Sequence, residues 1–467
     1  MSMPVMPTRI LIVGGGGREH ALAWKLAAEP GVNQVWVAPG SAGIGLEPRV
    51  GCLREVDALV PAAVVAAARS TSAELVVIGP EAPLAAGVAD ALAEAGVTVF
   101  GPSRAAAQIE TSKAFCHEVA AAAGVPMARS RAFAAGQLDE ARAFAAELAA
   151  AGHGLVVKAD GLAAGKGVRV CDDLVAAEAQ LADAFDPAPS YRSETPGAPR
   201  VVVEERLFGL EVSVIAVTDG RFALALPSAR DHKRLLDGDR GPNTGGMGAY
   251  SPVADLPDAD AAALLATIHR PILAELARRG TPFRGFLYAG LILTADGPVL
   301  LECNARLGDP EAQVILPRLA GPLGPVLLAA ALGELRTIAE TQAADVAGLP
   351  TLPGATVGIV LAAEGYPDTP RRGQPIEGLE EAVARGGLVF HAGSLGRPGG
   401  GYGTNGGRVL TVVGRGPDVT AARAAAERAA DAIAWDGLQR RHDIAAGEVP
   451  VEAPAEPQPA TAGGASR

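Results

Sequence analysis

The strongest constraint on the fold of this chain is a glycine- and lysine-rich segment enclosed by two short apolar runs, Leu155–Val157 and Val168–Val170. Apolar runs of this length, separated by a tight excursion, are typical of the two strands of a hairpin. The glycines let the backbone fold closely over a ligand, and the lysines attract a polyanion. The residues that we expect to bind phosphates here are Lys158, Gly161, Gly165, Lys166 and Gly167. The alternative is a hairpin with an exposed tip, since no Ser or Thr follows Lys166 as in a Walker motif.

A second short strand indicates the kind of polyanion. Val201–Val203 leads into Glu204, and further acceptors follow at Leu207 and Glu211. A strand that ends in carboxylates and backbone acceptors can bind an adenine amino group and a ribose. With the glycine loop over the phosphates, the two segments together predict an ATP site.

Composition limits the alternatives. The 467 residues suggest about three domains. A formal net charge of −12, without a run of five basic residues, disfavours nucleic acid and membrane surfaces as partners. The cysteines have no CxxC or Cys/His spacing, so we expect neither structural zinc nor a disulfide framework. The N-terminus lacks an apolar signal segment and no apolar run approaches about 18 residues, so we expect a cytoplasmic protein.

The first hundred residues repeat an apolar strand followed by a glycine-containing turn four times, with Ala-rich helical segments between most of them. This pattern predicts an α/β fold with a parallel, doubly wound sheet that binds ligands at the carboxyl ends of its strands. The first turn fails the dinucleotide pattern G-x-G-x-x-G, because Glu19 or His20 stands where the last glycine belongs. We therefore expect a site for a single phosphate at a helix amino end, and a turn without a ligand is the alternative. The amides predicted to form it are those of Gly15, Gly16 and Gly17.

The sequence leaves two interpretations open for each of two charged residues, Glu81 and Lys113. Glu81 could accept a hydrogen bond from a sugar hydroxyl, although a solvated carboxylate is the simpler interpretation. Lys113 lies in a segment, residues 103–123, that we expect to be helical up to Gly124. A solvated surface lysine is again the simpler interpretation. Residues 132–151 are expected to form another helix.

A long segment between residues 228 and 252 carries the motifs ARDHKR and GPNTGGMGAYSP. Consecutive basic or titratable side chains followed by a glycine-rich turn favour a second anion or substrate site. A long surface connection is the alternative. The substrate-binding residues expected here are Asp231, Lys233, Asn243, Thr244 and Gly245.

The motif PVLLECNARLGDPE supplies candidate metal ligands. Glu302 and Asn304 are two residues apart on an expected strand, so their side chains project from one face. Hard oxygen ligands beside nucleotide phosphates suit Mg²⁺, whereas a polar edge strand is the alternative. Arg306 continues the same alternation if the strand persists, and Asp309 follows at a turn. Arg306 could then neutralise a carboxylate or a developing negative charge.

From about residue 351 we expect a separate small domain, with strands at residues 356–362, 389–392 and 408–413 and a closing helix at residues 418–435. The motif TNGGRV could reach the shared cleft, but we favour a plain hairpin loop. Residues 451–467 are of low complexity and are expected to be disordered.

Taken in order, these motifs resemble one known family. VGGGGREHALAWKL, APGSAG, IGPEAPL, ETSKAF, VVKADGLAAGKGV, DHKR, GPNTGGMGAYSP, GFLYAGL, ECNARLGDPE and TNGGRVL are similar in order and spacing to the phosphoribosylamine–glycine ligase family of the ATP-grasp superfamily. The resemblance covers about residues 9–445. The chain departs from the family at Cys303 and Leu307, where aromatic residues are common, and at Gly209–Glu211, which replaces a more acidic segment.

The resemblance implies three domains and an activity. The domains are a Rossmann-like N-terminal domain (residues 1–110), an ATP-grasp domain (111–340) with a mobile lid at about 130–205, and a C-terminal α/β domain (341–450). The activity is ligation of glycine to 5-phosphoribosylamine with ATP and Mg²⁺ or Mn²⁺, giving glycinamide ribonucleotide, ADP and phosphate in purine synthesis. We expect a monomer. The alternatives are another ATP-grasp ligase or carboxylase, or a nucleotide-binding protein without catalysis.

The resemblance also implies residue roles, and it overrides the surface interpretation of Lys113. Lys113 and Lys158 would bind phosphates beneath a closing loop at residues 161–167. Apart from the resemblance, we expect Lys166 and, from its spacing to Asn304, Arg306 to serve catalysis. Adenine, ribose and metal would be held by Glu204 and Leu207, by Glu211, and by Glu302 and Asn304, respectively. Because a carboxylate is a poor acyl donor, we expect glycine to react through a glycyl phosphate.

Overall fold

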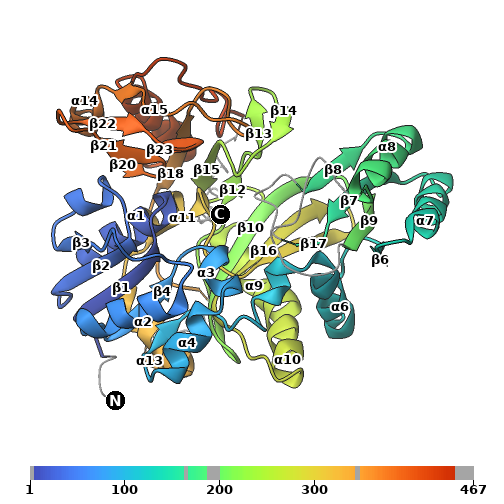
Figure 1. Cartoon of the computed structure of the whole chain (residues 1–467), viewed down its shortest axis with the longest axis horizontal. Coiled ribbons are helices and arrows are strands. Elements are labelled where there is room, and N and C mark those ends of the chain that lie inside the picture. The colour runs from blue at the N-terminus through green and yellow to red at the C-terminus, as the bar shows by residue number, and fades with distance from the viewer. Residues whose placement is uncertain (1–4, 162–166, 187–199, 342–347, 448–467) are drawn as a thin grey trace, which may run out of the picture.

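The computed structural model describes residues 5–161, 167–186, 200–341 and 348–447 (Figure 1). Gly165 and Lys166 of the expected closing loop therefore lie outside the described residues, as does the tail at residues 451–467. Among the described residues, no helix combines the length and the apolar character needed to cross a bilayer.

The N-terminal part is a five-stranded parallel sheet in the order β3-β2-β1-β4-β5. Its strands are β1 (Arg9–Gly14), β2 (Gln34–Pro39), β3 (Val50–Cys52), β4 (Leu75–Ile78) and β5 (Val99–Phe100). Residues 10–13 of β1 are completely buried, as expected for a central strand covered on both faces. The parallel sheet confirms the α/β prediction, but β3 was missed because its three half-buried residues form no apolar run.

Helices flank this sheet on both sides (Figure 1). They are α1 (Gly17–Ala27), the 3₁₀ turn η1 (Ile44–Leu46), α2 (Pro61–Ser70), α3 (Glu81–Ala85) and α4 (Val88–Glu94). Helices α1 and α3 begin directly after strands β1 and β4, so their amino ends lie at the carboxyl edge of the sheet. That edge faces the rest of the molecule.

The lid is a four-stranded antiparallel sheet that extends away from the body (Figure 1). The strands of this sheet are β6 (Ser130–Ala134), β7 (Gly154–Ala159), β8 (Val168–Cys171) and β9 (Arg200–Arg206), in the order β6-β9-β7-β8. The lid also contains two helices, α7 (Leu138–Ala150) and α8 (Leu174–Ala184). The predicted helix at 132–151 is wrong in its first residues, because β6 pairs with β9 and a turn at Gly136, with φ of +90°, separates it from α7. The lid has its own small core, which includes Phe133, Phe144 and Leu155.

The central sheet has the order β11-β10-β16-β17, with antiparallel neighbours. Its strands are β10 (Leu210–Asp219), β11 (Ala223–Ala225), β16 (Arg284–Thr294) and β17 (Gly297–Asn304). The helices around it are α5 (Gln108–Thr111), α6 (Lys113–Ala123), α9 (Asp258–Ala263), the π-helical η2 (Leu265–His269), α10 (Arg270–Arg278), α11 (Glu311–Ile315), the 3₁₀ turn η3 (Leu316–Arg318), α12 (Gly324–Leu332) and α13 (Leu335–Thr341). The predicted helix at 103–123 is interrupted at Ser112, whose extended backbone and side chain cap α6 by accepting from the Phe115 amide.

The segment at residues 228–252 is not an unstructured connection. It contains β12 (Arg230–Asp231), β13 (Arg234–Leu236), β14 (Arg240–Asn243) and β15 (Gly248–Ser251). Strands β13 and β14 form a hairpin, while β12 and β15 join the C-terminal strands in a sheet of order β12-β15-β18-β23-β20. Three C-terminal strands therefore share a sheet with the central region, whereas three others form a separate sheet among themselves.

The remaining C-terminal elements complete a compact layer above the N-terminal sheet (Figure 1). They are β18 (Ala355–Ala362), β19 (Pro375–Ile376), α14 (Leu379–Ala384), β20 (Leu388–His391), β21 (Ser394–Gly396), β22 (Tyr402–Thr404), β23 (Arg408–Gly416) and α15 (Val419–Ala430). The predicted strands and closing helix are confirmed within a few residues. Asp418 caps α15 by accepting from the Ala421 amide.

Candidate active site

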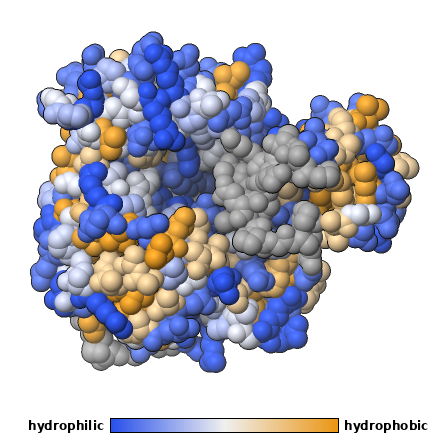
Figure 2. Space-filling model, in the orientation of Figure 1, coloured by the Kyte–Doolittle hydropathy of each residue, from blue (hydrophilic) through white to orange (hydrophobic). Residues whose placement is uncertain are grey.

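Predicted nucleotide and metal residues meet in one pocket between the lid and the central sheet. Lys113 comes from the start of α6, Lys158 and Glu204 from the lid strands β7 and β9, and Glu302 from β17. The other side chains that line this pocket are Ile109, Cys116, His117, Met127, Leu301 and Cys303. Figure 2 shows a hydrophilic hollow to the left of the residues drawn in grey, apart from the pocket that these side chains line. The expectation that the lysine segment, the acidic strand and the Glu302 motif surround one cavity is therefore confirmed for these four residues.

Lys158 and Glu204 form a buried ion pair across the lid sheet. Antiparallel pairing of β7 with β9 places Val156 opposite Glu204, so Lys158 lies two residues along the same face. Its Nζ lies 2.7 Å from Glu204 Oε2, and His117 Nε2 lies 2.7 Å from Glu204 Oε1. Burial opposes both charges, but the mutual attraction raises the pKa of Lys158 and, together with His117, lowers the pKa of Glu204.

Glu302 is the carboxylate around which the cations gather. Lys113 Nζ lies 4.0 Å from Glu302 Oε2. Burial by itself would raise the pKa of Glu302, but Lys113, Lys233 and Lys158 lower it to about 2. Asn304 Nδ2 lies 3.4 Å from Glu302 Oε1, which confirms that the two side chains share one face of β17. An ionised carboxylate and an amide oxygen on one face form a donor set that fits a hard cation.

A second cluster lies on β10 and β12. Lys233 pairs with Glu211, and the pKa of Lys233 is raised well above its usual value because Glu211, Asp231 and Glu302 outweigh the effect of burial. Burial together with the nearby carboxylates raises the pKa of Asp231 to about 7, against the opposing effect of Lys233. Leu207 lies in the connection between β9 and β10. The residues predicted for ribose and substrate, Glu211 and Lys233, are thus in contact.

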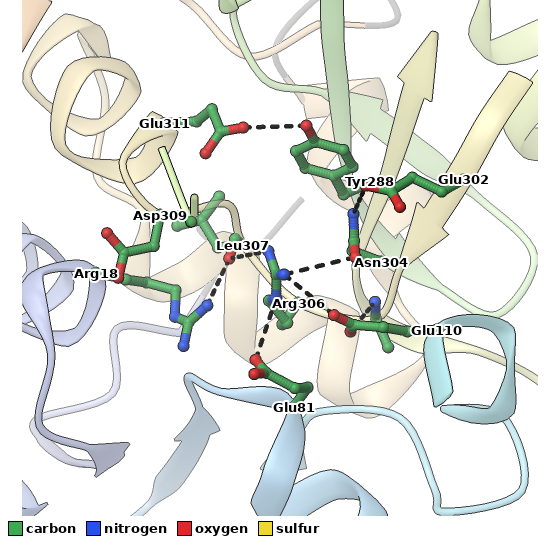
Figure 3. A network of polar contacts seen from close by, with 12 residues as sticks. Arg18, Glu81, Glu110, Tyr288, Glu302, Asn304, Arg306, Leu307, Asp309 and Glu311 are labelled. Atoms are coloured by element: carbon green, nitrogen blue, oxygen red, sulfur yellow. Dashed lines mark hydrogen bonds and ion pairs between the residues drawn. The ribbon is translucent and has the colours of Figure 1, made fainter. Parts of the chain in front are cut away.

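Arg306 lies at the centre of a separate acidic cluster (Figure 3). Its Nη2 lies 3.1 Å from Glu110 Oε1, and its Nε lies 3.4 Å from Glu81 Oε2 without hydrogen-bond geometry. These carboxylates raise the pKa of Arg306 against the effect of burial. Strand β17 ends at Asn304, so Arg306 does not continue the strand alternation as predicted. It reaches Asn304 instead from the following turn, with Nη2 3.5 Å from Oδ1.

Glu81 and Glu110 anchor this cluster from the N-terminal side. Glu81 begins α3, and Glu110 lies in α5 and accepts a hydrogen bond from the Ala305 amide at 2.8 Å. The simpler interpretation of Glu81 as a solvated carboxylate is wrong, because Arg306 and Arg18 surround it and lower its pKa despite burial. Burial raises the pKa of Glu110, and the negative charge of Glu81 adds to this effect, whereas Arg306 opposes it.

Several partners in the site were missed from the sequence. Ser213, Tyr288 and Glu311 form a buried triangle in which Tyr288 donates to Glu311 Oε1 at 3.0 Å and Ser213 Oγ lies 2.7 Å from the Tyr288 hydroxyl and 3.2 Å from Glu311 Oε1. Figure 3 shows the Tyr288 and Glu311 side chains pointing toward each other. Glu311 stands in the DPE motif, where its charge was the only signal. The other missed partners are Arg18, Glu110, His117 and Arg408.

The glycine turn before α1 is occupied by the chain's own carboxylate. The Gly16 amide donates to Glu19 Oε2 at 2.7 Å, and a Cβ at Gly15 would approach the Gly40 carbonyl oxygen to 2.8 Å. Gly17 faces Gln313, whose amide donates to Asp309 Oδ1 at 2.8 Å. A phosphate at Gly15–Gly17 would therefore have to displace Glu19 from the Gly16 amide.

The TNGGRV motif reaches the site, so its interpretation as a plain hairpin loop is wrong. Arg408 Nη2 lies 3.2 Å from Asp309 Oδ2, and its guanidinium also donates to the backbone carbonyl of Gly245. The Thr244 hydroxyl donates to the Lys233 carbonyl at 2.8 Å. Asn243, the preceding residue, ends β14. The predicted substrate residues of the central segment are thus connected to the C-terminal strands.

The nucleotide pocket between a four-stranded lid and an antiparallel central sheet is the arrangement of ATP-grasp proteins. A biotin carboxylase domain of the Hydrogenobacter thermophilus 2-oxoglutarate carboxylase has this fold, with a TM-score of 0.65 at 16% identity over 93% of this chain and 92% of that one. The sequence matches the phosphoribosylglycinamide synthetase N domain at residues 8–110, the ATP-grasp (A) domain at 111–312 and the C domain at 356–447. The chain belongs to the phosphoribosylglycinamide synthetase family.

Relatives within the family are similar over nearly their whole length. A phosphoribosylamine–glycine ligase of Streptomyces coelicolor is 50% identical over 444 residues, which cover 94% of this chain and 99% of the relative. One of Mycobacterium leprae is 45% identical, with 93% and 97% covered. The crystal structure of the Thermotoga maritima phosphoribosylamine–glycine ligase superposes with a TM-score of 0.74 at 32% identity and covers 93% of this chain and 100% of that chain.

Proposed function

We propose that this enzyme ligates glycine to 5-phosphoribosylamine with ATP, giving glycinamide ribonucleotide, ADP and phosphate. The carrying observation is the convergence of Lys113, Lys158 and Glu302 on one pocket in a chain of this family. Full-length relatives named phosphoribosylamine–glycine ligase support the choice of substrates. The reaction belongs to purine biosynthesis.

The nucleotide binds by exchanging ion-pair partners. Lys158 Nζ lies 2.7 Å from Glu204 Oε2, and Lys113 Nζ lies 4.0 Å from Glu302 Oε2. The phosphates of ATP offer the same lysines a higher negative charge, so both ammonium groups turn toward the triphosphate. Leu207, on the connection from β9 to β10, and Glu211, near the start of β10, are the residues proposed to bind adenine and ribose.

Glu302 and Asn304 are the residues that hold Mg²⁺ or Mn²⁺. Their donor chemistry fits, because Glu302 has its pKa lowered to about 2 and is ionised at neutral pH, while Asn304 adds a neutral oxygen. When bound, the divalent cation offsets negative charge on the phosphates. Together with Lys113 and Lys158, this charge makes phosphoryl transfer possible.

Glycine is activated as glycyl phosphate. Its carboxylate oxygen bonds to the γ-phosphorus while the bond to the β-phosphate oxygen breaks and ADP leaves. The amine of phosphoribosylamine then attacks the carbonyl carbon, loses a proton, and expels inorganic phosphate. Arg306 is held between the metal motif and the N-terminal carboxylates, where it steadies the acyl phosphate and the tetrahedral oxyanion. Water must be excluded from this intermediate, because the acyl phosphate would otherwise hydrolyse.

The phosphoribosylamine end of the site lies toward the N-terminal and C-terminal parts. Asp309, Gly245 and Arg408 connect these parts with each other, and Gly15–Gly17 begin α1 nearby. The sugar phosphate is bound by the amides of this turn once Glu19 gives up the Gly16 amide. Asp231, Lys233, Asn243 and Thr244 complete the substrate side.

A coupled assay of ADP release with direct detection of glycinamide ribonucleotide tests this function. ADP and product should form only when ATP, glycine and phosphoribosylamine are all present. Glu302→Gln should lose the activity and its dependence on the divalent cation. Turnover with bicarbonate in place of glycine would instead assign the chain to the ATP-grasp carboxylases. We further propose a cytoplasmic monomer, and a mass measurement in solution by light scattering checks the oligomeric state.

A further inference from the structure

The hairpin β13–β14 connects the two halves of the proposed substrate segment. Lys233 directly precedes β13, and Asn243 ends β14. The two strands pair at two positions, with a register shift between them. The hairpin projects beside the C-terminal layer (Figure 1), and its tip at residues 238–241 is exposed. A short two-stranded hairpin is marginally stable by itself, so its position depends on what holds it from outside.

Arg441 is a buried side chain that holds this hairpin. It is 1% exposed, although it lies near the C-terminal end of the described residues. Its Nη1 donates to the Arg234 carbonyl of β13 at 3.1 Å and to Asp239 Oδ1 at the hairpin tip at 2.6 Å. Its Nε and Nη2 donate to the two Asp443 carboxylate oxygens at 2.7 and 2.8 Å. One planar guanidinium thus connects the first strand and the tip of the hairpin with the C-terminal segment, residues 441–445.

Backbone amides add three hydrogen bonds between the hairpin region and the C-terminal segment. These bonds run from Gly238 to Asp443, from His442 to Asp237 and from Ala445 to His232 Nε2, at 2.8, 2.8 and 3.3 Å. His232 stands between Asp231 and Lys233, two of the proposed substrate residues. The C-terminal segment therefore contacts both the tip of the hairpin and the motif at its base.

We propose that Arg441 is a positioning residue for the binding of phosphoribosylamine, because it fixes the hairpin and thereby Lys233 and Asn243. The identity of the substrate in this inference rests on the proposed function. Arg441 is not among the residues that line the nucleotide pocket. It acts on the substrate through the hairpin and touches none of the reacting atoms.

The base of the hairpin transmits its position to the substrate residues. The amide and the hydroxyl of Thr244 both donate to the Lys233 carbonyl, at 2.7 and 2.8 Å, so the two ends of the hairpin move together. A lysine at position 441 would keep the positive charge but could not hold the Arg234 carbonyl and two carboxylates in one plane. The loosened hairpin would then have to become ordered when the substrate binds, which weakens binding.

Steady-state kinetics of Arg441→Lys test this role. The KM for phosphoribosylamine should rise at least about 10-fold, as expected when charge-assisted hydrogen bonds that order the site are lost. The value of kcat should stay within about 2-fold of the wild type, because the bound complex is the same once it has formed. The Kd for ATP should change less than about 3-fold.

Arg440→Lys is the matched control. Arg440 is the preceding residue, and its side chain is also mostly buried, at 11% exposed. It pairs with Glu427 of α15 and with Asp431, directly after that helix, and thus on the side away from the hairpin contacts of Arg441. Its kinetic constants should equal those of the wild type. An equal rise of the KM in both variants would show a general effect of the C-terminal domain and would overturn the inference.

Asp239→Asn weakens the same contact from the exposed side, where folding is not at risk. The Asp239 side chain is 70% exposed, and its φ of +52° is a backbone conformation that asparagine tolerates. The KM for phosphoribosylamine should rise about 3-fold. Combined with Arg441→Lys, this change should add less than about 2-fold, because both variants act on one contact. A normal KM in both folded single variants would remove Arg441 from substrate positioning.

Hydrogen exchange of the unliganded protein separates this inference from the proposed function. In Arg441→Lys, amides of residues 234–243 should exchange about 10-fold faster, while those of β16 in the central sheet keep their wild-type rates. Unchanged exchange in the hairpin overturns the inference, as does faster exchange with a normal KM. If the wild type forms no product, the proposed function fails, and the exchange rates still report whether Arg441 holds the hairpin.

Discussion

The nucleotide pocket and the Arg306 cluster hold their cations in different ways. In the pocket, Lys158 and Lys113 each face a carboxylate that a phosphate can replace. Arg306 is instead fixed by carboxylates from two N-terminal helices, Glu81 and Glu110. A flexible ammonium group changes partner readily, whereas a planar guanidinium held on several sides keeps its position. We infer that the pocket determines ATP affinity and that the Arg306 cluster determines turnover.

The largest effect should come from Arg306→Lys. A lysine keeps the positive charge but cannot span Glu81, Glu110 and a substrate oxygen at once. We expect kcat to fall about 100-fold, as on loss of a preorganised donor, while the Kd for ATP changes less than about 3-fold. Steady-state kinetics and calorimetric ATP titration measure the two quantities.

Arg278→Lys is the matched control for this change. Arg278 also bridges a carboxylate with two nitrogens, to Glu275 at 2.7 Å, but its side chain is 70% exposed on α10. Its kinetics should equal those of the wild type. An Arg306→Lys protein with normal kcat and weakened ATP binding would reverse the assignment of the two regions.

Glu204→Gln should lower the free energy of unfolding without directly changing a group that takes part in the reaction. Both Glu204 oxygens are in use and the side chain is 3% exposed, so an amide leaves either Lys158 or His117 facing a donor. Breaking a buried pair typically costs about 3 kcal/mol or more of unfolding free energy. Urea unfolding of the unliganded protein measures the change.

The neighbouring residue provides the comparison. Glu205 lies on the same strand but faces His153, whose side chain is 40% exposed. Glu205→Gln should cost less than about 1 kcal/mol, as expected for a partly solvated pair. Equal losses in the two variants would mean that the Glu204 pair adds nothing beyond a surface ion pair.

Lys158→Met should weaken ATP binding about 30-fold, because a charge-assisted contact to a phosphate contributes about 2 kcal/mol. Lys25→Met is the control, since Lys25 donates to the Leu319 carbonyl outside the pocket. The double variant Lys158→Met/Glu204→Gln removes both charges and separates lost binding from an unpaired carboxylate. Unchanged ATP affinity in a folded Lys158→Met protein would remove Lys158 from the nucleotide site.

The sequence predicted the residues that lie on regular, apolar strands. Glu302 and Asn304 share a face because strand periodicity requires it, and the strand that carries Lys158 reads clearly from Leu155–Val157. The prediction of a helix at residues 132–151 was wrong for the residues of β6, because β6 pairs with β9, a strand distant in sequence. Local alanine content could not reveal that pairing.

The hydrogen-bond and ion-pair partners of these residues could not be predicted from the sequence. Glu110 accepts from an amide 195 residues away, and His117 reaches Glu204 across 87 residues. No spacing rule connects such positions, since the fold alone brings them together. The same holds for Arg408, which comes from the C-terminal strands to Asp309. The sequence therefore predicted several of the charged residues that line the pocket, but not the side chains that hold them.

The smallest effect concerns Asp231, whose neighbouring carboxylates include Glu302 of the nucleotide pocket. Burial and neighbouring carboxylates raise its pKa from the usual value near 3.8 to about 7. Between these values the folded protein retains a proton that the unfolded chain has lost, so the Asp231 contribution to stability falls as pH rises through this window. Asp231→Asn removes the titration, and the other ionisable groups are the same in both proteins.

The stability of the wild type minus that of Asp231→Asn should therefore decline between about pH 4 and pH 7 and stay level on either side. After allowance for partial exposure, we expect a decline of about 1–2 kcal/mol. Urea unfolding across this pH range, without ligands, measures it. A difference that instead grew with pH would mean that Lys233 governs Asp231 and lowers its pKa. The carboxylate would then belong with the exchangeable ion pairs of the nucleotide pocket.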